Sequence, residues 1–322
     1  MAKKRKFNLI SGREAIVLLI AILMAAFFCI NENFRTYPTL ITIANNAYYI
    51  SLMAIGVAFP LITGGVDLSI GTGLVCYALI GGHLIVTYDM PVAVGLIACV
   101  LSGALIGVLN GVLVAIMDLP PFLATLCTCM ITRGLGSVLF ASRMVTWPSA
   151  FSEKGWYIKA FKITTEGGTI IPVGIAVIVV LMLLMSFVLK KTKIGRYTIA
   201  IGSNKEATRL SGVNVRFYHI SAYVISGIFA GLAGIAYASI FSVVQPGAGA
   251  GTEMDAIGGA IVGGVSATGG YGTIFGTFLG VIVICLMKVG LPFIGLQANW
   301  QLIVTGLVLI GAVLVDVAKK KK

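Results

Sequence analysis

Five charged residues lie within or beside long apolar stretches of the chain, and they are the first candidates for chemistry. They are Asp67, Arg133, Glu253, Asp255 and Lys288. Because a charge in hydrocarbon is costly, such residues are usually paired or functional. Glu253 and Asp255 open an apolar stretch, where acids suit the positive end of a helix dipole. Arg133 and Lys288 can pair with an acid or extend toward a membrane surface.

The sequence carries no motif that indicates an enzyme or an ion relay. It has no G-x-x-x-x-G-K-[ST] loop for ATP phosphates, no G-x-S-x-G elbow and no H-E-x-x-H motif. No apolar stretch carries the row of acids or the repeated arginines of a proton relay or voltage sensor. The six cysteines have no metal-ligand spacing with histidine. We therefore expect no catalytic residue, no metal site and no cofactor.

Two glycine pairs interrupt the apolar stretches, at Gly64–Gly65 and Gly263–Gly264, each a few residues after an Ala-Ile-Gly sequence. Adjacent glycines favour the end of a helix, and Asp67 or Ser69 can cap the helix that follows. Unwound backbone at membrane depth is tolerated only where protein or water satisfies its polar groups. The similarity of the two breaks hints at an internal duplication with parallel halves, a common transporter design.

Composition sets the fold class of the elements that hold these residues. Apolar residues make up 58% of the 322 residues and charged residues only 11%, which indicates a polytopic all-α membrane protein. The net charge of +12 comes from basic residues that flank apolar stretches. This is the positive-inside pattern rather than a nucleic-acid signature. Both ends are basic, at 3–6 and 319–322, so we expect both in the cytoplasm and an even number of spans.

A span needs about 20 apolar residues, which predicts about ten helices in a single transmembrane domain over 1–322. Their expected ranges are 14–30, 41–62, 70–88, 91–116, 122–141, 170–189, 218–241, 253–267, 273–291 and 298–317. This count places the loop 190–217 in the cytoplasm and the segment 142–169 outside. Eight or eleven spans remain open, because glycines interrupt the apolar stretches around 253–291.

The strongly polar island of the second half is Lys190–Arg216, which holds seven Lys and Arg residues. Ser203 and Glu206 have the S-x-x-E spacing of a capping box, in which each side chain satisfies an N–H at the helix start. Gly212 is placed to end that helix in the left-handed conformation. The pattern predicts a short helix on the membrane surface, either a docking element or part of an ordinary basic loop.

Four stretches in order resemble the permease subunits of bacterial ATP-binding-cassette importers for monosaccharides, over nearly the whole chain. The stretches are Gly64 to Gly71 (family pattern G-G-[IV]-D-L-S-[VI]-G), Pro121 to Leu126 (P-F-x-x-T-L), Ile194 to Val215 ([IF]-G-R, A-I-G-x-N-x-E-A and S-G-I-x-V), and Glu253 to Ser266 (E-L-D-A-I-A and G-G-[TV]-S). Cys127 stands where the family usually has Gly or Ala, and Gly258–Gly259 replaces the usual alanines.

The resemblance implies a noncatalytic subunit that forms half of a dimeric pore with a second copy or a similar permease. Its partners would be a cytoplasmic ATP-binding subunit and an extracytoplasmic sugar-binding protein, in the bacterial inner membrane with its lipid. The loop 190–217 would be the coupling element that docks on the ATP-binding subunit. Its expected coupling residues are Ser203, Lys205, Glu206, Ala207, Arg209 and Gly212. The glycine breaks, with Asp67 and Ser69, would shape mobile helix junctions near the path, and no sugar-contacting residue is evident.

Two other function classes remain open. A secondary transporter driven by protons or sodium would have only Asp67, Glu253 and Asp255 as membrane-embedded acids. A permease of the same superfamily for branched-chain amino acids or purine nucleosides would carry related motifs.

Overall fold

The computed structural model describes residues 12–165 and 168–320, so the basic runs at 3–6 and 321–322 lie outside the described residues. Helices dominate, with short 3-10 turns and two-residue strands between them. In chain order the elements are α1 (Gly12–Ile30), η1 (Glu32–Arg35), α2 (Tyr37–Ile62), α3 (Ile70–Val86), α4 (Val92–Ala115), α5 (Pro121–Val138), β1 (Val145–Thr146), η2 (Glu153–Ala160), β2 (Ile163–Thr164), β3 (Ile170–Ile171), α6 (Gly174–Lys191), α7 (Lys193–Ser203), α8 (Lys205–Leu210), α9 (Val215–Phe241), β4 (Val243–Val244), α10 (Thr252–Val262), α11 (Ile274–Gly290), η3 (Leu291–Ile294) and α12 (Ala298–Lys320).

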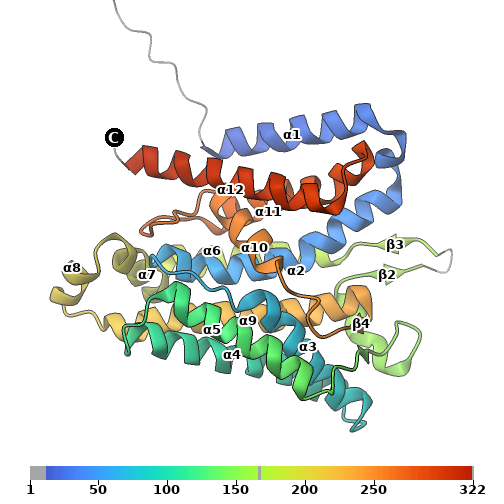
Figure 1. Cartoon of the computed structure of the whole chain (residues 1–322), viewed down its shortest axis with the longest axis horizontal. Helices are drawn as coiled ribbons and strands as arrows, with labels where there is room; N and C mark the ends of the chain where they lie inside the picture. The colour runs from blue at the N-terminus through green and yellow to red at the C-terminus, as the bar shows by residue number, and fades with distance from the viewer. Residues whose placement is uncertain (1–11, 166–167, 321–322) are drawn as a thin grey trace, which may run out of the picture.

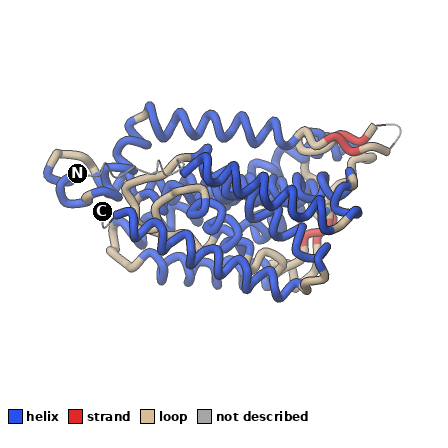
Figure 2. Tube along the Cα trace, turned by 90° about the horizontal axis from the view of Figure 1, so that it is seen from above, coloured by secondary structure: helices blue, strands red, loops and turns tan. Residues whose placement is uncertain are grey.

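The long helices run roughly along one direction and form an elongated bundle (Figure 1). Helices α7 and α8 lie at one end, and the hairpin of β2 and β3 lies at the other (Figure 1). Figure 2 shows the same bundle from above, with the strands near one end and many of the loops near both ends. Helix α1 begins and α12 ends toward the end that carries α7 and α8 (Figure 1).

Helix α2 is the core of the bundle. Its inner part, from Tyr48 to Ile62, is buried throughout, and it packs against α6, α9, α10 and α11. Such all-round apolar burial is typical of a helix at the centre of a membrane bundle. Helix α9 packs against α2 and also forms a close pair with α4, where a methyl group on Gly227 would overlap the backbone of Gly103. Small residues let helix backbones approach closely where lipid provides no hydrophobic driving force.

The structure supports an all-α polytopic membrane protein, and the predicted count of ten spans stays a prediction. Six helices of the described chain are long and apolar enough to cross a membrane: Tyr37–Ile62, Val92–Ala115, Pro121–Val138, Gly174–Lys191, Val215–Phe241 and Ile274–Ile294. Shorter apolar helices occur at Ile16–Ile30, Ile70–Val86 and Asn299–Leu314. The expected span 253–267 is corrected, because α10 has 11 residues and ends at Val262. At 1.5 Å per residue it is about 16 Å long, roughly half of the hydrocarbon thickness.

The predicted outer segment, 142–169, packs against the end of the bundle opposite α7 and α8. Strand β1 pairs antiparallel with β4, and the indole of Trp147 is buried and donates to the Ala78 carbonyl at 3.1 Å. The Lys162 ammonium reaches the Ile240 carbonyl at 3.4 Å, and burial lowers the pKa of this lysine. These contacts attach the segment to α3 and α9.

Candidate functional site

The two glycine breaks end their helices with the same backbone geometry. Gly64 and Gly264 take left-handed conformations, with φ of +85° and +89°. In each break the N–H of the left-handed residue donates to the carbonyl three residues earlier. The N–H of the next residue donates to the carbonyl five residues earlier. These bonds join Gly64 to Leu61 and Gly65 to Pro60, and Gly264 to Ile261 and Val265 to Ala260. This is the Schellman C-cap. The predicted breaks are therefore confirmed, although Gly65 and Gly263 do not take positive φ.

The two breaks touch each other and also touch the end of α7. The Gly270 amide donates to the Ile62 carbonyl at 2.8 Å, and a methyl group on Gly269 would lie 2.7 Å from the Gly64 nitrogen. A methyl group on Gly202, in the last turn of α7, would overlap the Ile62 carbonyl oxygen and lie 2.5 Å from the Gly270 nitrogen. We call these five residues, Ile62, Gly64, Gly202, Gly269 and Gly270, the break node. Sequence analysis singled out only Gly64 among them.

Asp67 lies fully buried beside the first break and organises a polar network. Its Oδ1 accepts from the Ser69 N–H at 3.0 Å, from the Ser69 hydroxyl at 2.6 Å and from the Asn110 amide at 3.4 Å. Asn110 also accepts from the Thr128 hydroxyl at 2.7 Å. Ser69 occupies the N-cap position of α3, as predicted, but its side chain makes no cap bond. Asp67 thus ties the α2–α3 junction to α4 through Asn110 and onward to α5 through Thr128.

Helix α8 is capped by Asn204, and the predicted capping box of Ser203 and Glu206 is wrong. Ser203 is the last residue of α7, and its hydroxyl donates back to the Ile199 carbonyl at 3.0 Å. Asn204 separates the two helices, and its side-chain oxygen accepts from the Ala207 N–H at 2.9 Å. Glu206 instead binds Arg209, with 2.8 Å between the guanidinium and the carboxylate. Gly212 follows the helix with φ of +79°, as predicted.

The short helix α8 stands away from the bundle. Of its six residues only Thr208 is buried, and the apolar side chain of Leu210 is 82% exposed. Lys205 approaches Asp118, in the turn between α4 and α5, with 3.6 Å between the charged atoms. An apolar side chain on a capped, water-facing helix suits docking to another protein.

The Asn204 cap gives a direct test of which residue starts α8. Asn204→Ala should lower the stability of this helix by about 1 kcal/mol, because the Ala207 N–H loses its partner. Transport should fall about fivefold if α8 must be formed to act. Ser203→Ala should transport like wild type, because its hydroxyl bonds only within α7. Rates of uptake in cells with matched expression check both variants. A loss of uptake in Ser203→Ala with normal uptake in Asn204→Ala would support the Ser203 capping box instead.

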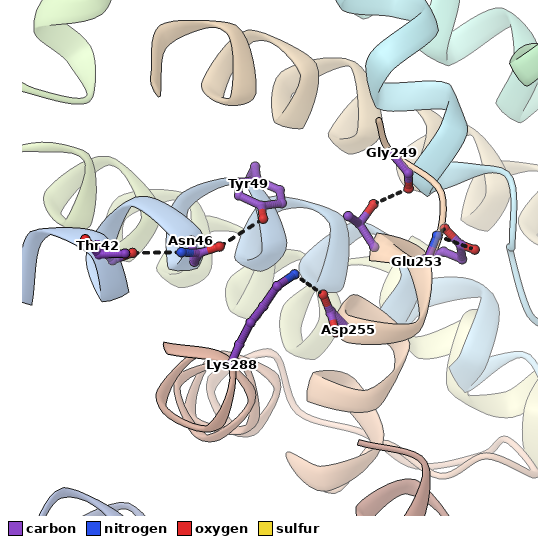
Figure 3. Close-up of polar contacts among 9 residues, drawn as sticks. Thr42, Asn46, Tyr49, Gly249, Glu253, Asp255 and Lys288 are labelled. Atoms are coloured by element: carbon purple, nitrogen blue, oxygen red, sulfur yellow. Dashed lines mark hydrogen bonds and ion pairs between the residues drawn. The ribbon is translucent and has the colours of Figure 1, made fainter. Parts of the chain in front are cut away.

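The intramembrane charges are partly paired. Lys288 of α11 binds Asp255 of α10, with 2.5 Å between the Nζ and Oδ2 atoms, and Figure 3 shows the lysine reaching toward the start of α10. The Glu253 carboxylate accepts from the Gly251 N–H at 3.0 Å and so caps the beginning of its own helix. Arg133 is exposed on α5 and forms no ion pair with the residues that the structure describes. Of the two alternatives for Lys288, the structure shows the pairing with an acid.

Polar side chains of α2 lie near this ion pair, and sequence analysis missed them. The Asn46 amide donates to the Thr42 carbonyl at 2.9 Å and accepts from the Tyr49 hydroxyl at 3.0 Å (Figure 3). The signal was present, because Thr42, Asn46 and Tyr49 have the i, i+4, i+7 spacing of one helix face. The apolar residues around them concealed it.

A cavity of about 320 Å³ lies between α2, α6 and α11. Its lining is almost entirely apolar and includes Ile41, Ala44, Ile175 and Phe278. Such a lining suits an apolar molecule and offers few partners to a polyhydroxylated one.

Comparison with known proteins sets this architecture in a family. The family described as "branched-chain amino acid transport system / permease component" matches residues 39–313. The chain belongs to this family of transport permeases. The permease is 35% identical to the ribose import permease protein of Escherichia coli K12, over 97% of this chain and 95% of the relative. It is 31% identical to the fructose import permease protein of Rhizobium meliloti, over 98% of this chain and 88% of the relative.

A third relative is the D-allose transport system permease protein of Escherichia coli K12, 31% identical over 98% of this chain and 95% of the relative. No solved structure matches the permease. The family predicted from four motifs is therefore confirmed, and the permease is a multi-pass protein of the bacterial inner membrane.

Proposed function

We propose that this permease forms half of the translocation pore of an ATP-driven monosaccharide importer. The observation that carries the proposal is near full-length similarity to permeases named for ribose, fructose and allose import. A separate cytoplasmic ATP-binding subunit supplies the energy, and an extracytoplasmic binding protein delivers the sugar. A second copy or a similar permease completes the pore, and the chain itself acts on no substrate covalently.

The coupling element is α8 together with α7, within the cytoplasmic loop 190–217 of the single permease domain. Helix α8 presents Leu210 and the pair of Glu206 and Arg209 to the ATP-binding subunit. Its movement passes along α7 to Gly202, which packs on the Ile62 carbonyl and the Gly270 amide. Both glycine breaks therefore receive the same displacement. In this arrangement the described end with α7 and α8 is cytoplasmic, and the segment 142–169 faces the binding protein.

The family description names branched-chain amino acids, so the substrate class needs its own test. Proteoliposomes holding the permease, the ATP-binding subunit and the binding protein should take up labelled D-ribose, D-fructose, D-galactose or D-allose when ATP is enclosed. Uptake of leucine or adenosine instead would favour the related permease classes. If uptake proceeds without ATP and an uncoupler abolishes it, the protein is a secondary transporter.

Docking through α8 is tested by co-purification in mild detergent. Leu210→Asp and Glu206→Lys should lose most of the bound ATP-binding subunit, because a charge replaces an apolar contact or is reversed within the docking face. Glu153→Lys makes the same charge change on the exposed η2 turn at the other end of the bundle and should retain the subunit. Equal recovery of the subunit with all three variants would contradict the assignment of α8.

A further inference from the structure

The polar side chains near the start of α10 lie part-way along the bundle rather than at its surface. Counted back from the break at Ile62, Tyr49 lies about 20 Å and Asn46 about 24 Å along α2, at 1.5 Å per residue. Counted the same way from Ile274, Lys288 lies about 21 Å along α11. The distances of Tyr49, Asn46 and Lys288 from the inner ends of their helices are therefore similar. They can be compared because α2, α10 and α11 meet near the break node and pack against one another.

Irregular backbone reaches the same depth. The segment 245–251 leaves β4 near the outer end and leads to the start of α10 inside the bundle, where Gly249 packs tightly on Gly71 of α3. Non-helical backbone at membrane depth is found where protein or a water-filled path satisfies it. Transporters commonly place their substrate sites at such interrupted helices.

The cluster keeps unused hydrogen-bonding groups. Among the described residues, the Asn46 amide donates one N–H to the Thr42 carbonyl, and its oxygen accepts from the Tyr49 hydroxyl. Its second N–H is left as a donor. Lys288 has three N–H donors and gives one to Asp255 Oδ2, which leaves Asp255 Oδ1 as an acceptor. The side chains of Lys288 and Asp255 are 30% and 15% exposed in the single chain, so a small molecule can reach them.

The chemistry of the cluster fits a neutral, hydroxyl-rich molecule. The ammonium and the carboxylate cancel, so the cluster carries no net charge to favour an anion or a cation. Tyr49 stacks edge-on against Tyr237 and Phe241 of α9, with ring centroids 5.5 and 6.2 Å apart, which adds an aromatic wall. A few placed polar groups beside apolar and aromatic side chains are typical of small-molecule sites.

The polar face of α2 runs from its outer end to this depth and then stops. Thr42 is exposed, Asn46 is half-buried and Tyr49 is buried. From Ile50 to Ile62 the helix is fully packed, and Ser51 is its one polar side chain there. The polar face therefore leads inward from the outer end and ends at the cluster.

We propose that Asn46, Asp255 and Lys288 form a subsite that binds the hydroxyl groups of the transported sugar midway along the bundle. This inference rests on the proposed function. Asn46 and Lys288 donate to sugar oxygens, and Asp255 accepts from a sugar hydroxyl. Tyr49 is a positioning residue, because its hydroxyl holds the Asn46 oxygen and so fixes the orientation of the amide.

The test measures sugar delivered per ATP hydrolysed in proteoliposomes holding the complete importer, with labelled D-ribose, D-fructose, D-galactose and D-allose. Asn46→Ala and Lys288→Met should lower this ratio at least about tenfold while the binding protein still stimulates ATP hydrolysis. Asn299→Ala makes the same change as Asn46→Ala at an exposed position near the start of α12 and should leave the ratio unchanged. Unchanged ratios in Asn46→Ala and Lys288→Met would overturn the subsite.

A hydroxyl-binding role also predicts a change in selectivity. Wild type should prefer the transported sugar over one of its monodeoxy derivatives, because an unpaired polar group in the site penalises the analogue. Asn46→Ala and Tyr49→Phe should reduce that preference about tenfold. A preference that survives in both variants would overturn the proposal.

Exchanging the two charges distinguishes a purely structural ion pair from one that binds sugar. Lys288→Met leaves Asp255 unpaired and can fail to fold, so the double variant Asp255→Lys with Lys288→Asp restores the pair. This double variant should assemble and hydrolyse ATP but deliver little sugar. Full recovery of uptake would reduce the pair to a structural contact. A wild-type importer that moves leucine and no sugar would overturn the proposed function as well.

Discussion

Gly202→Ala is expected to lower sugar uptake strongly while the ATP-binding subunit stays bound. The new methyl group would overlap the Ile62 carbonyl oxygen and lie 2.5 Å from the Gly270 nitrogen. Both atoms belong to the backbone and are joined by a hydrogen bond, so neither can rotate away. Alanine gains about 1 kcal/mol of helix propensity over glycine. Overpacking costs about 1–3 kcal/mol even where side chains can yield, so the break node must open.

The measurement is uptake in proteoliposomes together with co-purification of the ATP-binding subunit. Uptake should fall at least about tenfold, which corresponds to 1.4 kcal/mol. Gly311→Ala in α12 is the matched control, because it makes the same change in a helix where a methyl group meets nothing within 4 Å. Wild-type uptake by Gly202→Ala would show that α7 does not press on the breaks.

The tight contact at Gly202 explains why a capped helix outside the bundle can act on distant spans. Helix α7 buries Gly195, Thr198 and Ile201 on one side and ends against both glycine breaks. Backbone-to-backbone contact has no side chain that could absorb a displacement, and packed elements of this kind shift rather than deform. A push on α8 therefore reaches α2 and the α10–α11 junction together.

Sequence patterns predicted the helices well because a membrane span needs a long apolar stretch, and such stretches are visible in one dimension. All ten expected ranges contain a helix, and both glycine breaks end one. The expected span 253–267 was too long, although the predicted break at Gly263–Gly264 lies inside it and ends α10 at Val262. The pattern also did not show which glycine of each pair becomes left-handed. It is the first glycine of Gly64–Gly65 and the second glycine of Gly263–Gly264.

The errors in the candidate site have local and long-range causes. Ser203 and Asn204 are adjacent residues that can both cap a helix, and the S-x-x-E spacing favoured the wrong one. A serine in a continuing helix can instead bond the carbonyl four residues back. The break node joins α2, α7 and the 263–273 linker, which are far apart in sequence, so no local pattern could reveal Gly202.

Gly65→Ala should block transport, and Tyr223→Phe should restore it in the same chain. Gly65 has no positive φ, so the backbone allows alanine there. Its methyl group would, however, overlap the Tyr223 hydroxyl, while the next atoms, Tyr223 Cζ and Pro121 Cβ, lie at 3.4 and 3.5 Å. Removing the hydroxyl therefore leaves ordinary contacts for the methyl group. In the described structure that hydroxyl is buried without a hydrogen-bond partner, so its loss costs little.

The four chains of this double-mutant cycle separate steric blockage of the break from other effects of each change. Gly65→Ala alone should lower uptake about tenfold, since overpacking costs about 1–3 kcal/mol. Tyr223→Phe alone should stay near wild type, and the double variant should recover most of the uptake. Additive losses would mean that Gly65 matters for its flexibility rather than for the close approach of α9. Recovery would show that the α2–α3 junction works only while the Tyr223 ring can lie directly over Gly65.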